Sequence, residues 1–300
     1  MSEQTSSLTP ERILQRLDWQ VVRRLDGLLQ GDYRSLFYGY GVDFADLREY
    51  QPGDDIRYID WNVTARMDTP YIRQYAEDRE IIAWFLLDLS PSVDFGSAQT
   101  LKRKVLIDFV ATLARLLTRH GNRVGAVFYD SAVERTIPAR GGRIQVLRLI
   151  NDLLNQPPLV HAPFTDLSIL IKAGLNSIKK RSLIFVISDF ISSPGWDHPL
   201  HLLNRRHDVL AIRLWDPREV ELPDVGPIIL EDAETGEQVY VDTHDRKFRQ
   251  QFQEAARLRE AGLKETFQHS GVDMLSLSTE EDLVRAIVKF ASLRRQKRRK

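Results

Sequence analysis

A short polar motif that follows an apolar run carries residue types able to bind a metal ion. The motif is Asp88-Leu89-Ser90-Pro91-Ser92, in which one carboxylate and two hydroxyls stand at alternate positions. Three hard oxygen donors in one tight loop suit Mg²⁺ or Mn²⁺. The structural alternative is a loop in which the carboxylate and the serines only cap the following helix.

Two further stretches supply polar residues that could join this motif. Residues 81–87 and 182–187 are short apolar runs typical of strands covered on both faces of a parallel sheet. The second run is followed by Ser188-Asp189, and Thr165 opens a helical pattern upstream of it. Ligands of open α/β sheets bind where loops leave the carboxyl ends of strands on either side of the topological switch point. If the two strands are neighbours there, five side chains converge: Asp88, Ser90, Ser92, Thr165 and Asp189.

This five-residue set resembles the metal-ion-dependent adhesion site of von Willebrand factor A domains, which consists of D-x-S-x-S, a Thr and an Asp. All five positions are filled in this sequence. The resemblance implies that Asp88, Ser90 and Ser92 hold the cation, and that Thr165 and Asp189 bind it directly or through water. It also implies that a carboxylate from a partner protein completes the coordination.

The order of apolar and polar segments predicts an α/β fold with a doubly wound, mostly parallel sheet. From residue 81 onward, strand and helix patterns alternate. Residues 123–129 and 132–138 are expected to form a hairpin at the edge of the sheet. The predicted division is an N-terminal helical and irregular segment packed on the main domain (1–80), a von Willebrand factor A-like domain (81–293) with an inserted β ribbon (217–242), and a basic tail (294–300).

The segment 36–80 interleaves aromatic residues, acids and arginines without a helical period. One interpretation is a second metal cluster made of Asp54, Asp55 and Asp60. The other pairs these acids with arginines under aromatic cover. We favour the second, because arginines match the acids nearly one for one, and we expect buried ion pairs that fix the segment to the main domain. The arginines concerned are Arg48, Arg57, Arg66 and Arg73.

The same segment carries a second resemblance. The stretch GYGVDFADLREYQPGDDIRYIDWNVTAR is similar to the signature of the domain of unknown function 58 (DUF58) family, and so are Ser188-Asp189-Phe190 and Asp216-Pro217-Arg218-Glu219. In that family this segment precedes a von Willebrand factor A-like domain. Members are typically encoded beside MoxR-type AAA+ ATPases and are thought to act with them in maturing or assembling proteins. The resemblance therefore implies such an ATPase, or its client, as the partner.

Composition narrows the setting of the protein. The 300 residues contain 42 Lys and Arg, 42 Asp and Glu, and no Cys. Balanced charge gives no global attraction to nucleic acid, and the lack of cysteine fits a reducing cytoplasm. There is no signal-peptide pattern and no apolar run near the ~18 residues of a membrane span. The basic cluster 294–300 is expected to be a solvated tail, although it is also compatible with peripheral contact to an anionic membrane or an acidic partner.

Three classes of function fit these residues: a non-enzymatic, Mg²⁺-dependent protein-interaction module, a metal-dependent hydrolase, and a metal-free scaffold. A phosphatase with Asp88 as nucleophile normally has a second Asp two residues on, where this chain has Ser90. No histidine, lysine or further Asp is placed by the sequence to move a proton. The complete five-residue set argues against a scaffold, so we expect the interaction module.

Overall fold

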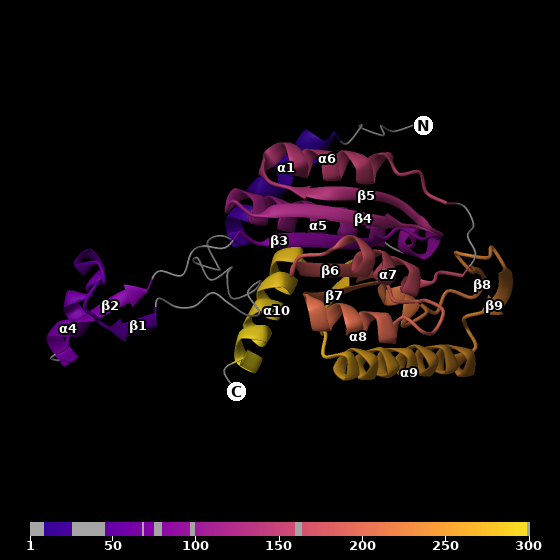
Figure 1. The fold of residues 1–300 in the computed structure, drawn as a ribbon. Coiled ribbons are helices and arrows are strands. Elements are labelled where there is room, and N and C mark those ends of the chain that lie inside the picture. Colours follow the sequence, from indigo (N-terminus) through magenta and orange to yellow (C-terminus); the bar gives the residue numbers. More distant parts are fainter. Residues whose placement is uncertain are drawn as a thin grey trace. The chain divides into compact units, whose positions relative to one another are not determined.

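The computed structural model describes residues 9–25, 46–67, 69–74, 80–96, 100–159 and 164–298 (Figure 1). Contacts divide the chain into two compact units. One contains residues 1–36 and 81–300, and the other contains residues 37–80. Within the described residues, no helix combines the length and the apolar character that a membrane crossing requires.

Six strands of the larger unit form one sheet, in the order β10-β7-β6-β3-β4-β5. All neighbours are parallel except β4 and β5, which form the antiparallel hairpin that the sequence predicts at the edge. Numbered one to six by their order along the chain, these strands lie in the sheet as 6-5-4-1-2-3. This is the doubly wound order, in which the side of the sheet to which new strands are added changes between β3 and β6. The predicted doubly wound, mostly parallel α/β fold is therefore confirmed. The strands are β3 (Ile82–Asp88), β4 (Arg123–Tyr129), β5 (Val133–Arg140), β6 (Leu183–Ser188), β7 (Asp208–Trp215) and β10 (Asp273–Ser278).

Helices cover both faces of this sheet, which explains why its central strands are almost entirely apolar (Figure 1). On one face, α7 packs on β3 and β4, α8 packs on β7, and α9 lies against α8. On the other face, Phe109 of α5 meets Phe185 of β6 edge-on, and Phe185 stacks on Phe85 of β3. The helices are α5 (Lys102–Arg119), α6 (Gly142–Asn155), α7 (Leu167–Ser177), α8 (Asp197–Arg206), α9 (Arg246–Ser270) and α10 (Leu283–Arg298).

A close approach holds α7 on the centre of the sheet. A Cβ atom added to Gly174 of α7 would stand 2.8 Å from a methyl carbon of Leu86 in β3. Glycine therefore lets the helix approach the strand closely without displacing the Leu86 side chain.

The helix α1 (Pro10–Leu17) continues into a π-helical turn (Asp18–Val22) and belongs to the larger unit. Thr9 caps it, as its position before Pro10 predicts: its hydroxyl accepts a hydrogen bond from the Arg12 N–H. The helix packs on α5 and α6. Arg16 pairs with Asp108 of α5 at 2.5 Å.

A small hairpin interrupts the alternation after β7, as the turn signals of residues 217–242 predict. A 3-10 turn (Pro217–Glu219) leads to β8 (Pro227–Glu231), which pairs antiparallel with β9 (Gln238–Asp242). We refer to residues 227–242 as the β8–β9 hairpin.

The C-terminal helix α10 extends into the segment that the sequence predicts as a solvated basic tail. Arg294 lies within the helix and is only 4% exposed. Its guanidinium pairs with Asp208 at 2.6 Å and with Asp273 at 3.2 Å, at the starts of β7 and β10. The first residue of the expected tail is thus a structural cation, because two aspartates that begin neighbouring strands require a counter-charge there.

The smaller unit contains an antiparallel pair of strands, β1 (Asp46–Glu49) and β2 (Tyr71–Gln74), a 3-10 turn (Ile56–Tyr58) and the helix α4 (Trp61–Met67). The part of the predicted signature before Asp46 lies outside the described residues. The expectation that this unit packs on the main domain stays a prediction.

The acids of this unit have structural partners. Asp54 makes a bidentate pair with Arg48, at 2.7 and 2.6 Å. Asp60 is buried and caps α4 by accepting from the Asn62 and Val63 N–H groups. Asp55 pairs with Arg57, whose side chain is 84% exposed within this unit. The expected burial of such pairs against the main domain stays a prediction.

Candidate metal centre

The predicted site lies at the carboxyl ends of β3 and β6, which are hydrogen-bonded parallel neighbours. Asp88 is the last residue of β3, and Asp189 directly follows β6. This is the point where the strand order reverses, so the loops after both strands emerge at the same edge of the sheet. The five side chains are 0 to 8% exposed.

Asp88 is a fully buried carboxylate held by neutral groups. Its Oδ1 accepts a hydrogen bond from the Ser90 N–H at 3.0 Å, and its Oδ2 accepts one from the Ser188 hydroxyl at 2.6 Å. No lysine, arginine or histidine among the described residues forms an ion pair with it. Burial, and after it the Asp189 carboxylate, raise the pKa of Asp88 to about 7, against the opposing effect of the hydrogen bonds. Near neutral pH the Asp88 carboxyl is therefore only partly ionised, and the negative charge that it carries has no ion-pair partner among the described residues.

The two serines of the motif turn their hydroxyls toward each other. Ser90 Oγ and Ser92 Oγ lie 3.2 Å apart, on a 3-10 turn (Pro91–Asp94) that starts directly after Ser90. The alternative role as helix caps is not observed for this turn, since no side chain caps its first residues. Two adjacent hydroxyl oxygens next to a carboxylate form a compact set of hard donors.

Asp189 is paired with a lysine that the sequence analysis did not consider. Lys102 Nζ, on the first residue of α5, donates to Asp189 Oδ2 at 2.8 Å and to Glu219 Oε1 at 2.5 Å. The Lys102 side chain is 1% exposed. Burial alone would lower the pKa of its ammonium, but the two carboxylates outweigh burial and hold that pKa above its usual value. Lys102 is therefore a fixed positive charge at the site, which the sequence did not place there.

The backbone after Asp189 is constrained. Phe190 has a φ of 60°, a left-handed conformation that is unusual for a bulky residue. Its N–H donates to the Ser188 hydroxyl at 2.8 Å, and its ring contacts Trp196 and Phe267, with centroids 5.4 and 4.9 Å away. Packing of the ring thus stabilises a strained residue that directly follows Asp189.

Thr165 is paired with a residue from the β8–β9 hairpin rather than with the other four predicted ligands. Its backbone N–H donates to Glu234 Oε2 at 2.8 Å, and its hydroxyl donates to Glu234 Oε1. Thr165 is 1% exposed and Glu234 is 7% exposed. Ser92, Thr165, Glu219 and Glu234 all line one cavity of about 800 Å³, so the hairpin faces the same space as two of the five predicted ligands. Asp88, Ser90 and Asp189 do not line this cavity.

Lys102, Glu219 and Glu234 are charged residues near the predicted ligands that sequence reasoning missed. Glu219 belongs to the segment 216–219 that resembles the family signature, which offered one signal. Lys102 contacts a residue 87 positions away in the sequence, and Glu234 contacts one 69 positions away. Patterns of residue spacing in the sequence do not predict contacts at such separations.

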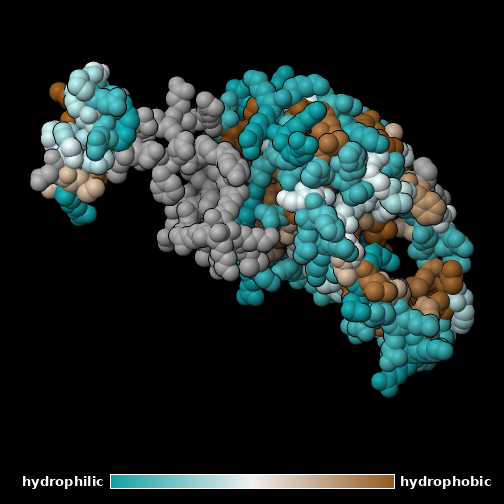
Figure 2. Space-filling model, turned by 60° about the horizontal axis from the view of Figure 1, so that its bottom comes forward, coloured by the Kyte–Doolittle hydropathy of each residue, from teal (hydrophilic) through white to brown (hydrophobic). Residues whose placement is uncertain are grey.

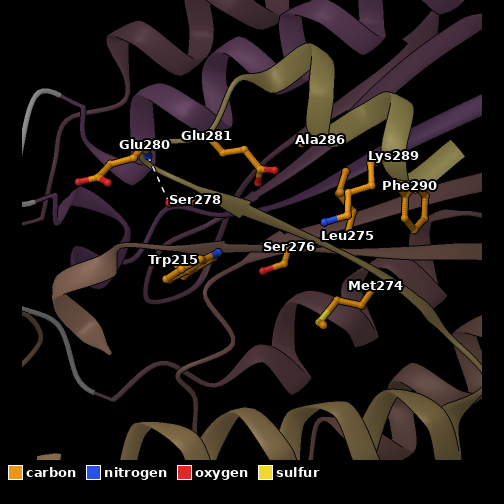
Figure 3. Close-up of a pocket in the computed structure, with 10 residues that line it drawn as sticks. All are labelled: Trp215, Met274, Leu275, Ser276, Ser278, Glu280, Glu281, Ala286, Lys289 and Phe290. Atoms are coloured by element: carbon orange, nitrogen blue, oxygen red, sulfur yellow. Dashed lines mark hydrogen bonds between the residues drawn. The ribbon is translucent and has the colours of Figure 1, made fainter. Parts of the chain in front are cut away.

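A second cavity, of about 540 Å³, lies at the ends of β7 and β10 (Figure 3). Its acids, Glu280 and Glu281, point away from each other, and a single hydrogen bond, from the Glu280 N–H to the Ser278 hydroxyl, is drawn between its residues. This cavity does not gather its polar groups on one point, in contrast to the site at Asp88.

The residues at Asp88 fit a small, hard divalent cation better than a metal that prefers nitrogen or sulfur ligands. Among the described residues, no cluster of three or more His, Asp or Glu side chains could hold a metal ion. The set here is of another kind, with two carboxylates and three hydroxyls. Such hard oxygen donors suit Mg²⁺ or Mn²⁺. The buried charge of Asp88, which lacks a counter-ion, is the feature that a cation would complete.

The chain belongs to the family described as protein of unknown function DUF58, whose model matches residues 46–262. It is 38% identical over 283 residues to the uncharacterized proteins Rv1480 of Mycobacterium tuberculosis and Mb1516 of Mycobacterium bovis, covering 94% of this chain and 89% of each relative.

Two similar solved structures cover 72% of this chain. One is BatB from Bacteroides thetaiotaomicron, with 13% identity, 98% of its own chain covered and a TM-score of 0.44. The other is an aerotolerance-related membrane protein from Bacteroides fragilis, with 16% identity, 99% covered and a TM-score of 0.44.

Proposed function

We propose that this protein is a non-enzymatic interaction module that binds its partner through a divalent cation, Mg²⁺ or Mn²⁺, at Asp88. The observation that carries the proposal is the buried Asp88 carboxylate, which stands beside Asp189 and two serine hydroxyls without a cationic partner. A buried charge of this kind is costly unless an ion neutralises it. Lys102 contacts both Asp189 and Glu219, so it offsets one of the three carboxylates of Asp88, Asp189 and Glu219 and leaves two negative charges for a divalent ion. Glu234, on Thr165, adds a further carboxylate nearby.

Asp88, Ser90, Ser92, Thr165 and Asp189 would hold the cation. When bound, the cation supplies a Lewis-acidic position that can take up a carboxylate from another protein. The residues of this chain set the conditions for that event: the aspartates hold the ion, the hydroxyls add donors without charge, and Lys102 fixes the orientation of Asp189. Apolar side chains at the rim, Phe95, Phe164 and Ile191, are 38 to 69% exposed and offer contact area to a partner.

The partner that membership of the DUF58 family supports is a MoxR-type AAA+ ATPase, or a client protein on which such an ATPase acts. The partner would present an Asp or Glu to the cation. This chain would then act in the maturation or assembly of other proteins.

The contacts of Asp88 favour this proposal over the phosphatase alternative. Both Asp88 oxygens accept hydrogen bonds and the side chain is fully buried, whereas a nucleophile must reach its substrate. Lys102 is the nearby candidate for moving a proton, but its raised pKa keeps it protonated at neutral pH, so it cannot serve as a base.

Binding to the purified MoxR-type AAA+ ATPase of the same organism, in excess Mg²⁺, tests the proposal. We expect Asp88→Ala to lose binding and Asp94→Asn to keep it. Asp94 is a matched control because it lies on the same turn and pairs with Arg103 at the surface. Equal binding by both variants would show that the metal site is not involved. Metal-dependent hydrolysis of p-nitrophenyl phosphate that disappears in Asp88→Asn would establish the hydrolase instead.

A further inference from the structure

The cavity of about 800 Å³ beside Thr165 is a groove with apolar walls, which we call the hairpin groove. Its walls come from the loops after β3 and β6, from α9, and from the β8–β9 hairpin with the segment that leads into it. Figure 2 shows hydrophobic residues around a hollow on the side of the molecule that carries the hairpin. Exposed apolar surface gathered in one place marks a site that a partner covers. Four apolar side chains of these walls are 38 to 69% exposed: Phe95, Phe164, Ile191 and Val225.

The acids of the groove already have partners within the chain, whereas its two arginines do not. Arg218 and Arg259 are exposed, and neither forms an ion pair or a side-chain hydrogen bond with another described residue. A guanidinium binds a carboxylate through two parallel hydrogen bonds, so these two groups are suited to an acid that the chain itself does not supply. The four carboxylates, which all accept hydrogen bonds from other groups of this chain, belong to Glu219, Glu231, Asp232 and Glu234.

The positions of the two arginines keep them available. The residues three and four positions from Arg259 along α9 are alanine, glycine and leucine, so no acid of its own helix can pair with it. Arg257, on the same helix, does pair with an acid in this way, because Glu254 lies 2.6 Å from it. The backbone of Arg218 is fixed by its N–H, which donates to Asp216 at 2.9 Å, while its side chain stays exposed.

The strand β8 offers backbone groups to an extended chain on the groove side. β8 and β9 form a two-stranded sheet, so each strand has an outer edge whose alternate N–H and C=O groups take no part in their pairing. Residues of β8 line the groove and residues of β9 do not. Ile228 and Leu230 line it, while Ile229 between them is 62% exposed, as the alternation of a strand requires. A two-stranded hairpin is weakly stable by itself, and a third strand would strengthen it.

We propose that the hairpin groove binds an extended segment of a partner protein in which apolar side chains stand next to an acidic residue. The segment pairs with β8 as a third strand, its apolar side chains cover the walls, and its carboxylate meets Arg218 and Arg259. A lipid anion would leave the edge of β8 unused, and a basic segment would be repelled by the two arginines. The groove and its arginines require no cation, so this contact is separate from the one proposed at Asp88 and does not rest on it.

The test uses the full chain in EDTA and the peptide acetyl-Leu-Val-Phe-Val-Glu-Glu-amide, which carries an uncharged fluorophore. Fluorescence anisotropy compares this peptide with two analogues, in which Gln or Lys replaces both Glu residues. We expect the Glu peptide to bind most tightly, with the same affinity in EDTA and in Mg²⁺. Equal affinity of the Glu and Gln peptides, or tighter binding of the Lys peptide, would overturn the proposal. Binding that appears only in Mg²⁺ would assign the peptide to the metal centre instead of the groove.

Two matched pairs of substitutions locate the peptide. Arg259→Gln should weaken binding about fivefold, the scale of one surface ion pair. Arg257→Gln should not, because this residue lies about 200° around the same helix and is already paired with Glu254. Ile228→Glu should abolish measurable binding by placing an acid in the groove, whereas Ile229→Glu, the next residue of β8, should preserve it. If each substitution binds the peptide as its control does, the peptide does not occupy the groove.

Hydrogen exchange on wild type reports the backbone contact. Saturating peptide should slow exchange at the amides of β8 and leave those of β9 unchanged, and a lack of protection in β8 would reject the third strand. Two other occupants would also overturn the proposal. Displacement of the peptide by decanoate at equal affinity would make the occupant a lipid anion. A wild-type dimer in sedimentation that Ile228→Glu dissociates would make it a second copy of this chain.

Discussion

Replacing Asp88 with asparagine should stabilise the metal-free protein, although it removes a residue from the centre of the site. Asparagine keeps the shape of the side chain and an acceptor for the Ser90 N–H, while the buried negative charge disappears. A residue whose folded pKa lies above its unfolded value destabilises the folded state once it ionises. For Asp88 the pKa rises from 3.8 to about 7. That difference corresponds to about 4 kcal/mol above pH 7.

The pH dependence gives the sign of the effect. Between pH 3.8 and about 7 the folded wild type takes up a proton at Asp88 more readily than the unfolded chain does. The metal-free wild type therefore gains stability from this group as the pH falls, and Asp88→Asn does not. The advantage of the variant should be largest near pH 8 and should shrink toward pH 5.

Urea unfolding in EDTA, followed by circular dichroism at several pH values, measures this difference. Excess Mg²⁺ provides the second arm, because it should stabilise wild type by mass action and leave the variant unchanged. If metal-free Asp88→Asn is no more stable than wild type at pH 8, or if the difference does not depend on pH, the carboxylate is not an uncompensated charge.

Three other substitutions test the surrounding structure. Lys102→Met should destabilise the metal-free protein by about 3 kcal/mol, because two carboxylates lose their cation. The same substitution should increase the affinity for Mn²⁺ in calorimetry. An unchanged affinity would show that the lysine does not compete with the ion for the site. His207 is buried, and burial lowers its pKa, so wild type should lose stability below pH 6.5 as the unfolded chain takes up the proton. His207→Phe should remove part of that loss in urea titrations. If both proteins lose the same stability at acidic pH, the loss belongs to other groups. Arg294→Met should lower the free energy of unfolding by about 2 kcal/mol, since two partly exposed aspartates lose their partner. Arg285→Met, at an exposed position of the same helix, serves as the control. Equal melting temperatures of the two variants would show that the Arg294 pairs are energetically neutral.

The sheet could be predicted because its signals are local. The apolar runs that end at Asp88 and Ser188 are short and unbroken, and they form the two central strands. A parallel strand covered on both faces can tolerate few polar residues, so the pattern is nearly unambiguous. The D-x-S-x-S motif lies within one loop, and its hydroxyls are 3.2 Å apart as that spacing suggests.

The partners of the site could not be predicted because they come from distant parts of the chain. Lys102 starts a helix and resembles any other basic residue until the fold brings it to Asp189. Glu234 lies in a turn rich in acids, where nothing in the sequence distinguishes it from Glu237. Such contacts depend on how the hairpin packs on the sheet, which hydrophobic periodicity does not encode.

Charge patterns were reliable for pairing and unreliable for burial. The prediction that Asp54 pairs with an arginine is confirmed by the bidentate contact with Arg48. Arg294 forms its pairs in the interior, where the sequence predicted a solvated tail. Counting charges identifies candidates for ion pairs, but exposure depends on the second layer of residues above them.

The central claim is that Asp88 and its neighbours bind one divalent cation, and calorimetric titration of Mn²⁺ into the metal-free protein tests it most directly. We expect a single saturable site in wild type and in Asp94→Asn, competition by Mg²⁺, and no measurable binding by Asp88→Asn under conditions where that variant is folded. Absence of binding by wild type, or binding by Asp88→Asn equal to that of wild type, would contradict the claim.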